Sequence, residues 1–185
     1  MKLNIEDKKT LLKIARESIE EEFGLKTVDS NQYFSPALNE QCGVFVTLNI
    51  NGQLRGCIGY IINNKPLYET VYEVAKKSAF EDPRFYPLSL EELSEIEIEI
   101  SVLSKPKKIN SIDEIKVGEH GLIVQKGVFH GLLLPQVATK YNWNKIEFLE
   151  HTCKKAGLDK NEWKDPQTII EIFSAEVFSE YDIGE

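Results

Sequence analysis

Several features that would point to a familiar class of protein are missing from this sequence. Its 185 residues contain only three cysteines, Cys42, Cys57 and Cys153, and no C-x-x-C pair. This argues against a disulfide framework, a zinc ribbon or an iron–sulfur centre. No run approaches the roughly 18 apolar residues of a membrane helix, and the N-terminus does not resemble a secretory signal. We therefore expect a soluble cytoplasmic protein without a resident cofactor.

Positive charge is also scarce, because 22 lysines and arginines face 30 acidic residues, for a net charge of −8. General attraction to nucleic acid is not expected from this balance. The most basic stretch, residues 105–108, has no interleaved aromatic residues and is typical of a solvated loop. The histidines His120, His130 and His151 do not stand at metal-ligand spacing, so no metal site is predicted.

Helical and strand patterns are interspersed along the chain. Apolar residues at helical spacing predict one helix from Asn4 to Gly24, and two more that begin near Asn64 and at Asn144. Residues 96–102 alternate isoleucine or valine with glutamate or serine, which predicts an antiparallel strand with one buried face and one solvated face. Hairpins separated by helices, without repeats or Gly/Ser linkers, predict an α+β fold of mainly antiparallel sheet with flanking helices.

A hairpin is predicted where β-branched and aromatic alternation surrounds Asn51-Gly52, the two residues of a type I′ turn. With this two-residue loop, Leu48 faces Arg55 and Val46 faces Cys57. The period of two then places Arg55, Cys57 and Gly59 on one face of the sheet. A second hairpin is predicted around residues 126–127, and it ends before Pro135.

Cys57 lies between Gly56 and Gly59 in the predicted hairpin. A glycine within a strand often marks a place where a ligand or another backbone comes close. We consider Cys57 a candidate nucleophile, because Arg55 on the same face would favour its thiolate. A buried, purely structural cysteine is the alternative. His130, beside Gly131, is the candidate base, with a surface imidazole as the alternative.

Further polar residues belong to turns. Asp82 and Arg84 follow the second predicted helix, where they form either an internal ion pair or part of a site. The amide of Gln136 follows a proline and would bind a polar ligand or cap backbone groups. If these three residues converged with Arg55 and Cys57, the cleft would suit a small anionic ligand.

Five stretches together resemble the AMMECR domain family: Gly43-Val-Phe-Val-Thr47, Leu54-Arg-Gly-Cys-Ile-Gly59, Asp82-Pro-Arg-Phe85, Gly131-Leu-Leu-Leu-Pro-Gln-Val137 and Lys155-Ala-Gly-Leu158. The resemblance spans most of the chain and implies one domain over residues 1–185 with a larger and a smaller subdomain. Microbial members resemble component A of a system encoded beside a Memo-like protein and a radical S-adenosylmethionine protein. The resemblance thus implies these two partners. Since the chain lacks the C-x-x-x-C-x-x-C spacing, radical chemistry would occur on a separate partner.

Two functions remain open. In one, the protein is an enzyme or enzyme component of a modification pathway that uses Cys57, together with the binding residues Arg55, Gly56, Gly59, Asp82, Arg84 and Gln136. In the other, the hairpin Leu54–Gly59 and the loop that follows the second helix form a non-catalytic surface for a partner protein. An enzyme would show a concave cleft with perturbed titratable groups, whereas an interaction surface would be flatter and more apolar.

Overall fold

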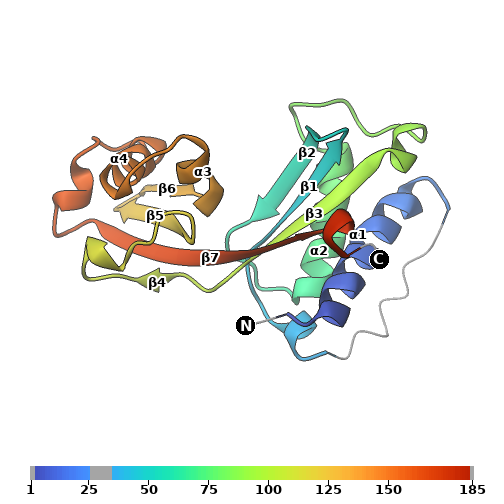
Figure 1. Ribbon diagram of the computed structural model, residues 1–185, viewed down its shortest axis with the longest axis horizontal. Coiled ribbons are helices and arrows are strands. Elements are labelled where there is room, and N and C mark those ends of the chain that lie inside the picture. Colours follow the sequence, from blue (N-terminus) through green and yellow to red (C-terminus); the bar gives the residue numbers. More distant parts are fainter. Residues whose placement is uncertain (1–2, 26–34, 184–185) are drawn as a thin grey trace. The chain divides into compact units, whose positions relative to one another are not determined.

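The computed structural model describes residues 3–25 and 35–183 of the chain (Figure 1). Contacts between residues divide the chain into two units. Unit 1 holds the residues up to Leu103 and those from Glu176 onward, and unit 2 holds Ser104–Ala175. Both units combine helices with antiparallel strands, so the predicted α+β fold is confirmed.

Unit 1 contains an antiparallel sheet with long helices packed on one face. Its strands, in their order across the sheet, are β2 (Gln53–Tyr60), β1 (Val44–Ile50) and β3 (Ile96–Leu103). Its helices are α1 (Ile5–Glu22), α2 (Leu67–Phe80), α5 (Glu180–Ile183) and the short 3-10 helices η2 (Ala37–Asn39) and η3 (Glu92–Ser94). Helix α2 packs on β1 and β2, and α1 packs on α2 and β3.

The core of unit 1 follows from the two periodicities of the sequence. Val44, Val46 and Leu48 alternate along β1 and are fully buried. Each such side chain contributes about 1.5–3 kcal/mol when it leaves water. The intervening residues Phe45 and Thr47 are only partly buried, because alternate side chains of a strand point to opposite faces. The face of the sheet opposite the helices is therefore the one that carries polar side chains.

Helix caps explain where the helices begin. Asn4 caps α1 as predicted and forms a capping box with Asp7, and Asn144 caps the third long helix in the same way. The expectation that Asn64 starts the second helix is wrong, since Pro66 occupies the N-cap of α2 without a side-chain hydrogen bond. Proline is well placed there because its φ angle suits a helix start.

The hairpin of β1 and β2 is confirmed, with Asn51 and Gly52 at φ angles of 51° and 74°, as a type I′ turn requires. The predicted register holds only for the first two pairs, Ile50 with Gln53 and Asn49 with Leu54. Beyond them Leu48 pairs with Gly56, so that Arg55 has no partner residue. The predicted pairs Leu48–Arg55 and Val46–Cys57 are therefore wrong, because a β-bulge inserts one extra residue into β2.

Unit 2 contains a second antiparallel sheet. Its strands, in order, are β6 (Phe129–Leu133), β5 (His120–Lys126), β7 (Ile169–Ser179) and β4 (Lys107–Lys108), and the residues of β7 from Glu176 onward belong to unit 1. Its helices are α3 (Pro135–Lys140), α4 (Lys145–Lys155) and the short η4 (Ile112–Glu114) and η5 (Glu162–Lys164). Helix α4 packs on β5 and β6. Pro135 ends the second hairpin as predicted, but it also begins α3, a helix that the sequence analysis missed.

Candidate functional site

The polar face of the unit 1 sheet brings Cys57 into a row with residues of two other strands. Thr47 of β1 pairs with Cys57 of β2 on one side and with Glu99 of β3 on the other. Directly opposite residues of an antiparallel pair have Cβ atoms about 4.5–5.5 Å apart and point to the same face. The row Cys57, Thr47, Glu99 thus places a thiol, a hydroxyl and a carboxyl side by side.

The Cys57 thiol is partly exposed and accepts a hydrogen bond from the Thr47 hydroxyl, with an Oγ1–Sγ distance of 3.3 Å. The Arg84 guanidinium donates to the Cys57 carbonyl at 3.0 Å. The pKa of Arg84 is raised above the usual value, chiefly by a hydrogen bond to Asp82 and less strongly by Cys57. A hydroxyl and a cationic guanidinium at one cysteine are an arrangement that supports nucleophilic chemistry.

Asp82 and Arg84 also hold the backbone of Cys57. Asp82 Oδ2 accepts the Cys57 N–H at 2.9 Å, and Arg84 Nη2 donates to the Cys57 carbonyl at 3.0 Å. The two side chains form an ion pair with an N–O distance of 2.6 Å, in which Asp82 is 4% exposed. The hydrogen bond with Arg84 keeps the pKa of the Asp82 carboxyl well below its usual range. Strand β2 lies at the edge of the unit 1 sheet, so no further strand binds its outer backbone groups. The pair of Asp82 and Arg84 forms the hydrogen bonds to the Cys57 N–H and carbonyl that such a strand would otherwise form.

Arg55 has a different role from the predicted one. Its guanidinium binds both carboxylate oxygens of Glu92, at 2.7 and 2.8 Å, and donates to the Tyr86 carbonyl at 3.1 Å. The hydrogen bond with Glu92 raises the pKa of Arg55. The bulge removes the register argument that placed Arg55 beside Cys57, and Arg84 is the arginine that binds the Cys57 backbone. Arg55 therefore fastens the hairpin to the loop that follows α2.

Gly56 and Gly59 are required by packing within unit 1. A Cβ atom on Gly56 would lie 2.1 Å from the Ser78 carbonyl oxygen of α2, and one on Gly59 would lie 2.2 Å from the Phe45 ring. Both distances are far inside van der Waals contact. The close approach that the sequence indicated is thus made by the chain itself, and a ligand-binding role for these glycines stays a prediction.

Glu99 is a residue that the sequence analysis assigned to a solvated sheet face. It is partly buried, and its pKa is raised by burial first and then by the charges of Glu97 and Asp182. The sequence does not show that Glu99 lies in the row of Cys57, because that position depends on which strand pairs with β1. The alternation of residues 96–102 predicts only that Glu99 lies on the polar face.

His130 and Gln136 belong to unit 2, His130 in β6 and Gln136 in α3. Both side chains are exposed. His120 and His151 also belong to unit 2, so unit 1 contains no imidazole. A proton acceptor near Cys57 from within unit 1 is therefore not a histidine, and the role of His130 and Gln136 at Cys57 stays a prediction.

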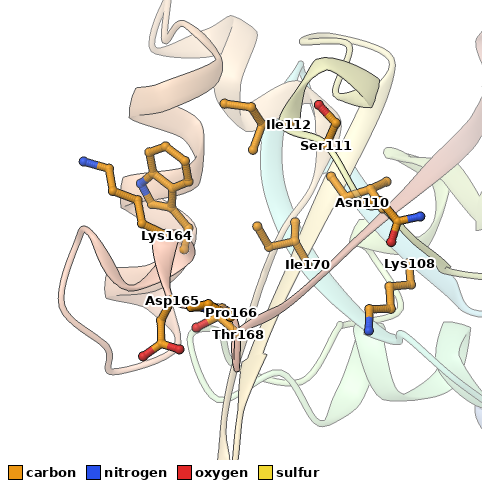
Figure 2. A pocket seen from close by; sticks show the side chains of 11 residues that line it. Lys108, Asn110, Ser111, Ile112, Lys164, Asp165, Pro166, Thr168 and Ile170 are labelled. Atoms are coloured by element: carbon orange, nitrogen blue, oxygen red, sulfur yellow. The ribbon is translucent and has the colours of Figure 1, made fainter.

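A cavity of about 510 Å³ lies within unit 2, beside Ile109, Ile170 and Trp163 (Figure 2). The charged ends of Lys164 and Asp165 point away from Ile170 in this view. The Asp165 carboxylate instead binds Lys126 at 2.8 Å. None of the predicted site residues borders the cavity. The thiol of unit 1 is therefore the better candidate site.

The described part of the chain has no helix long and apolar enough to cross a membrane. Among the same residues, no group of three or more potential metal ligands converges.

Comparisons with known proteins agree with the fold. The AMMECR1 family model matches residues 12–178. The chain is 46% identical to Protein LS215_2104 of Saccharolobus islandicus, over 96% of this chain and 83% of that protein. It is 43% identical to a protein of Methanothermobacter thermautotrophicus, over 96% of each. The crystal structure of the uncharacterized protein PH0010 from Pyrococcus horikoshii matches with a TM-score of 0.80 and 43% identity, over 91% of this chain and 89% of that one. With the motifs of the hairpin and the loop in their places, the chain belongs to the AMMECR1 family.

Proposed function

We propose that this AMMECR1-domain protein is an enzyme or enzyme component that uses Cys57 as a nucleophile on a small molecule or a protein side chain. The observation that carries the proposal is the hydrogen bond of the Thr47 hydroxyl to a partly exposed sulfur, in a residue whose backbone the Arg84 guanidinium binds. The other two cysteines, Cys42 and Cys153, are 6% and 0% exposed and belong to the cores. Only Cys57 has the surroundings of a reactive thiol.

The proposed chemistry uses three residues, Cys57, Arg84 and Asp82. Sulfur attacks an electrophilic carbon, and Arg84 offers positive charge to the thiolate before attack and after departure. Asp82 binds both the Arg84 guanidinium and the Cys57 N–H. It therefore holds the positive charge of Arg84 at a fixed position relative to the Cys57 backbone. The Arg84 side chain is 53% exposed and has donors to spare for an anionic group. This supports a small anionic substrate.

The proposed pathway includes partner proteins. The family resemblance supports a Memo-like protein and a radical S-adenosylmethionine protein as partners, with radical steps on the latter. In that arrangement the present protein acts before or after the radical step, and its own contribution is thiol chemistry at Cys57.

Alkylation by iodoacetamide, followed by mass spectrometry of the native protein, tests this proposal. We expect Cys57 to react well before Cys42 and Cys153, which serve as internal controls for unfolding. Arg84→Gln should slow the reaction of Cys57 by about tenfold through loss of the cation, whereas Lys9→Gln, a matched change of an exposed cation in α1, should not. A Cys57 that reacts only together with the buried cysteines would overturn the proposal.

The alternative function is a protein-interaction module. It is favoured by Tyr86, which is 90% exposed in the loop that Arg55 fastens to the hairpin. An exposed aromatic side chain on an ordered loop is typical of a binding hot spot. Under this alternative Tyr86→Ala abolishes partner capture while Cys57→Ser has no effect. Loss of partner-dependent activity in Cys57→Ser, with capture intact, would favour the enzyme.

A further inference from the structure

A second acid–base group belongs to the same site, and it lies one strand beyond Thr47. We propose that Glu99 is the general base of the reaction at Cys57 and takes a proton from the water that releases the product. This inference rests on the proposed function, since it assigns a role within the same thiol site. It also assigns the substrate class, namely a carbonyl compound whose acyl group is carried on sulfur.

The position of Glu99 follows from strand pairing. Thr47 is the register partner of both Cys57 and Glu99, so the three residues share one row of one face. Two adjacent pairs separate the Cβ atoms of Cys57 and Glu99 by about 10 Å. Thr47 lies between the two residues, so in this proposal Glu99 acts on the sulfur-bound group through one water molecule. A general base acts through such a water.

The surroundings of Glu99 suit a base. Among the described residues it has no ion-pair partner and no side-chain hydrogen bond, in contrast to the carboxylates of Asp82 and Glu92 on the other side of the site. The charged groups that face it are Glu97 on its own strand and Asp182 of α5, both acidic. Burial first, and then these two carboxylates, raise its pKa above the usual value, which makes the ionised carboxylate a stronger proton acceptor.

The step balances without a further reactant. The Cys57 thiolate, whose proton has gone to solvent, first forms a bond to the acyl carbon of an ester. The bond from that carbon to the alcohol oxygen breaks, and the departing alkoxide takes a proton from solvent. Water then forms a bond to the acyl carbon while its proton passes to the Glu99 carboxylate. The carbon–sulfur bond breaks, and its electron pair returns to sulfur beside Arg84. Glu99 finally releases the proton to solvent.

The experiment uses p-nitrophenyl acetate and the full chain. Mass spectrometry should show acetyl transfer to Cys57, and removal of excess reagent then allows the loss of the acetyl group to be timed at a series of pH values. We expect Glu99→Gln to slow this loss by about a hundredfold and to abolish its dependence on a group that must be ionised. Glu99→Asp should keep that pH dependence at a lower rate.

The matched control is Glu97→Gln, which changes the same residue type on the same strand and face but pairs with Asn49 instead of Thr47. It should keep the dependence on an ionised group, but with the pH profile moved to lower pH, because the Glu97 charge helps to raise the pKa of Glu99. Equal behaviour of Glu99→Gln and Glu97→Gln, with Cys57 still acetylated, would overturn the role of Glu99 and leave the proposed thiol intact. An absence of acetylation at Cys57 would overturn both. Protection of Cys42 from alkylation confirms that each variant is folded.

Discussion

Replacement of Asp82 by alanine is predicted to destabilise unit 1 by about 3 kcal/mol. The side chain accepts hydrogen bonds from the Cys57 N–H and from Arg84. Loss of the acceptor leaves the backbone N–H unpaired, which costs about 1–3 kcal/mol. The ion pair adds about 0.5–1 kcal/mol, a reduced figure because Arg84 is half exposed and screened by water.

The three cysteines allow this destabilisation to be assigned to one unit. Cys42 is buried in the core of unit 1 and Cys153 in unit 2. Pulsed alkylation along a urea series therefore yields one unfolding curve for each unit. Asp82→Ala should move the Cys42 curve and leave the Cys153 curve in place. Glu81→Ala, a neighbouring exposed carboxylate, should change either free energy of unfolding by less than about 0.5 kcal/mol.

The pH dependence gives an independent check. Because the folded pKa of Asp82 lies below its unfolded value, the stabilisation is present above the unfolded pKa of about 4 and is lost as pH falls through the folded pKa. The free-energy difference between wild type and Asp82→Asn should thus shrink below about pH 4. Two results would refute the role given to the hydrogen bonds of Asp82. One is a loss of unfolding free energy below about 1 kcal/mol in Asp82→Ala. The other is a free-energy difference between wild type and Asp82→Asn that does not change with pH.

Three further predictions follow from the same structure. Gly56→Ala should destabilise unit 1 by about 1–3 kcal/mol, measured by labelling of Cys42, because the new methyl group meets the backbone carbonyl of Ser78. Glu73 should titrate with a pKa of about 2 in NMR, since two lysines and a tyrosine donate hydrogen bonds to it. Its stabilisation is present above the unfolded pKa and is lost as pH falls toward 2. Glu99→Gln should make the folded state more stable at neutral pH, because the raised pKa means that folding opposes ionisation of this carboxyl. Urea unfolding at two pH values tests this, and an advantage that does not grow with pH would contradict it.

Local chemistry explains why much of the fold was predictable. The sequence Asn51-Gly52 sets both positive φ angles of the first hairpin, and Asn4 and Asn144 cap their helices through side chains three residues away. These features depend on neighbours in the chain. The pair Asp82–Arg84 was also predictable, since both residues lie in one turn.

Tertiary contacts explain what was missed. The bulge at Arg55 forms where the guanidinium binds Glu92 and the Tyr86 carbonyl, and the turn sequence contains no sign of these partners. Glu99 lies in the row of Cys57 because β3 pairs with β1. Strand alternation predicts the face on which a side chain lies, but the neighbour in the next strand depends on the topology.

Two of the three family motifs of unit 1 act together at Cys57. The hairpin Leu54–Gly59 supplies the thiol, and the turn of Asp82 and Arg84 supplies the groups that an adjacent strand would otherwise offer to the Cys57 backbone. Because Arg84 binds that backbone and supplies the positive charge of the proposed thiol chemistry, reactivity and stability share a residue. Substitutions at Asp82 and Arg84 should therefore be non-additive in both properties, since either single change already releases the guanidinium from its fixed position. If the double variant loses as much stability and thiol reactivity as the two single variants together, the roles of Asp82 and Arg84 are independent.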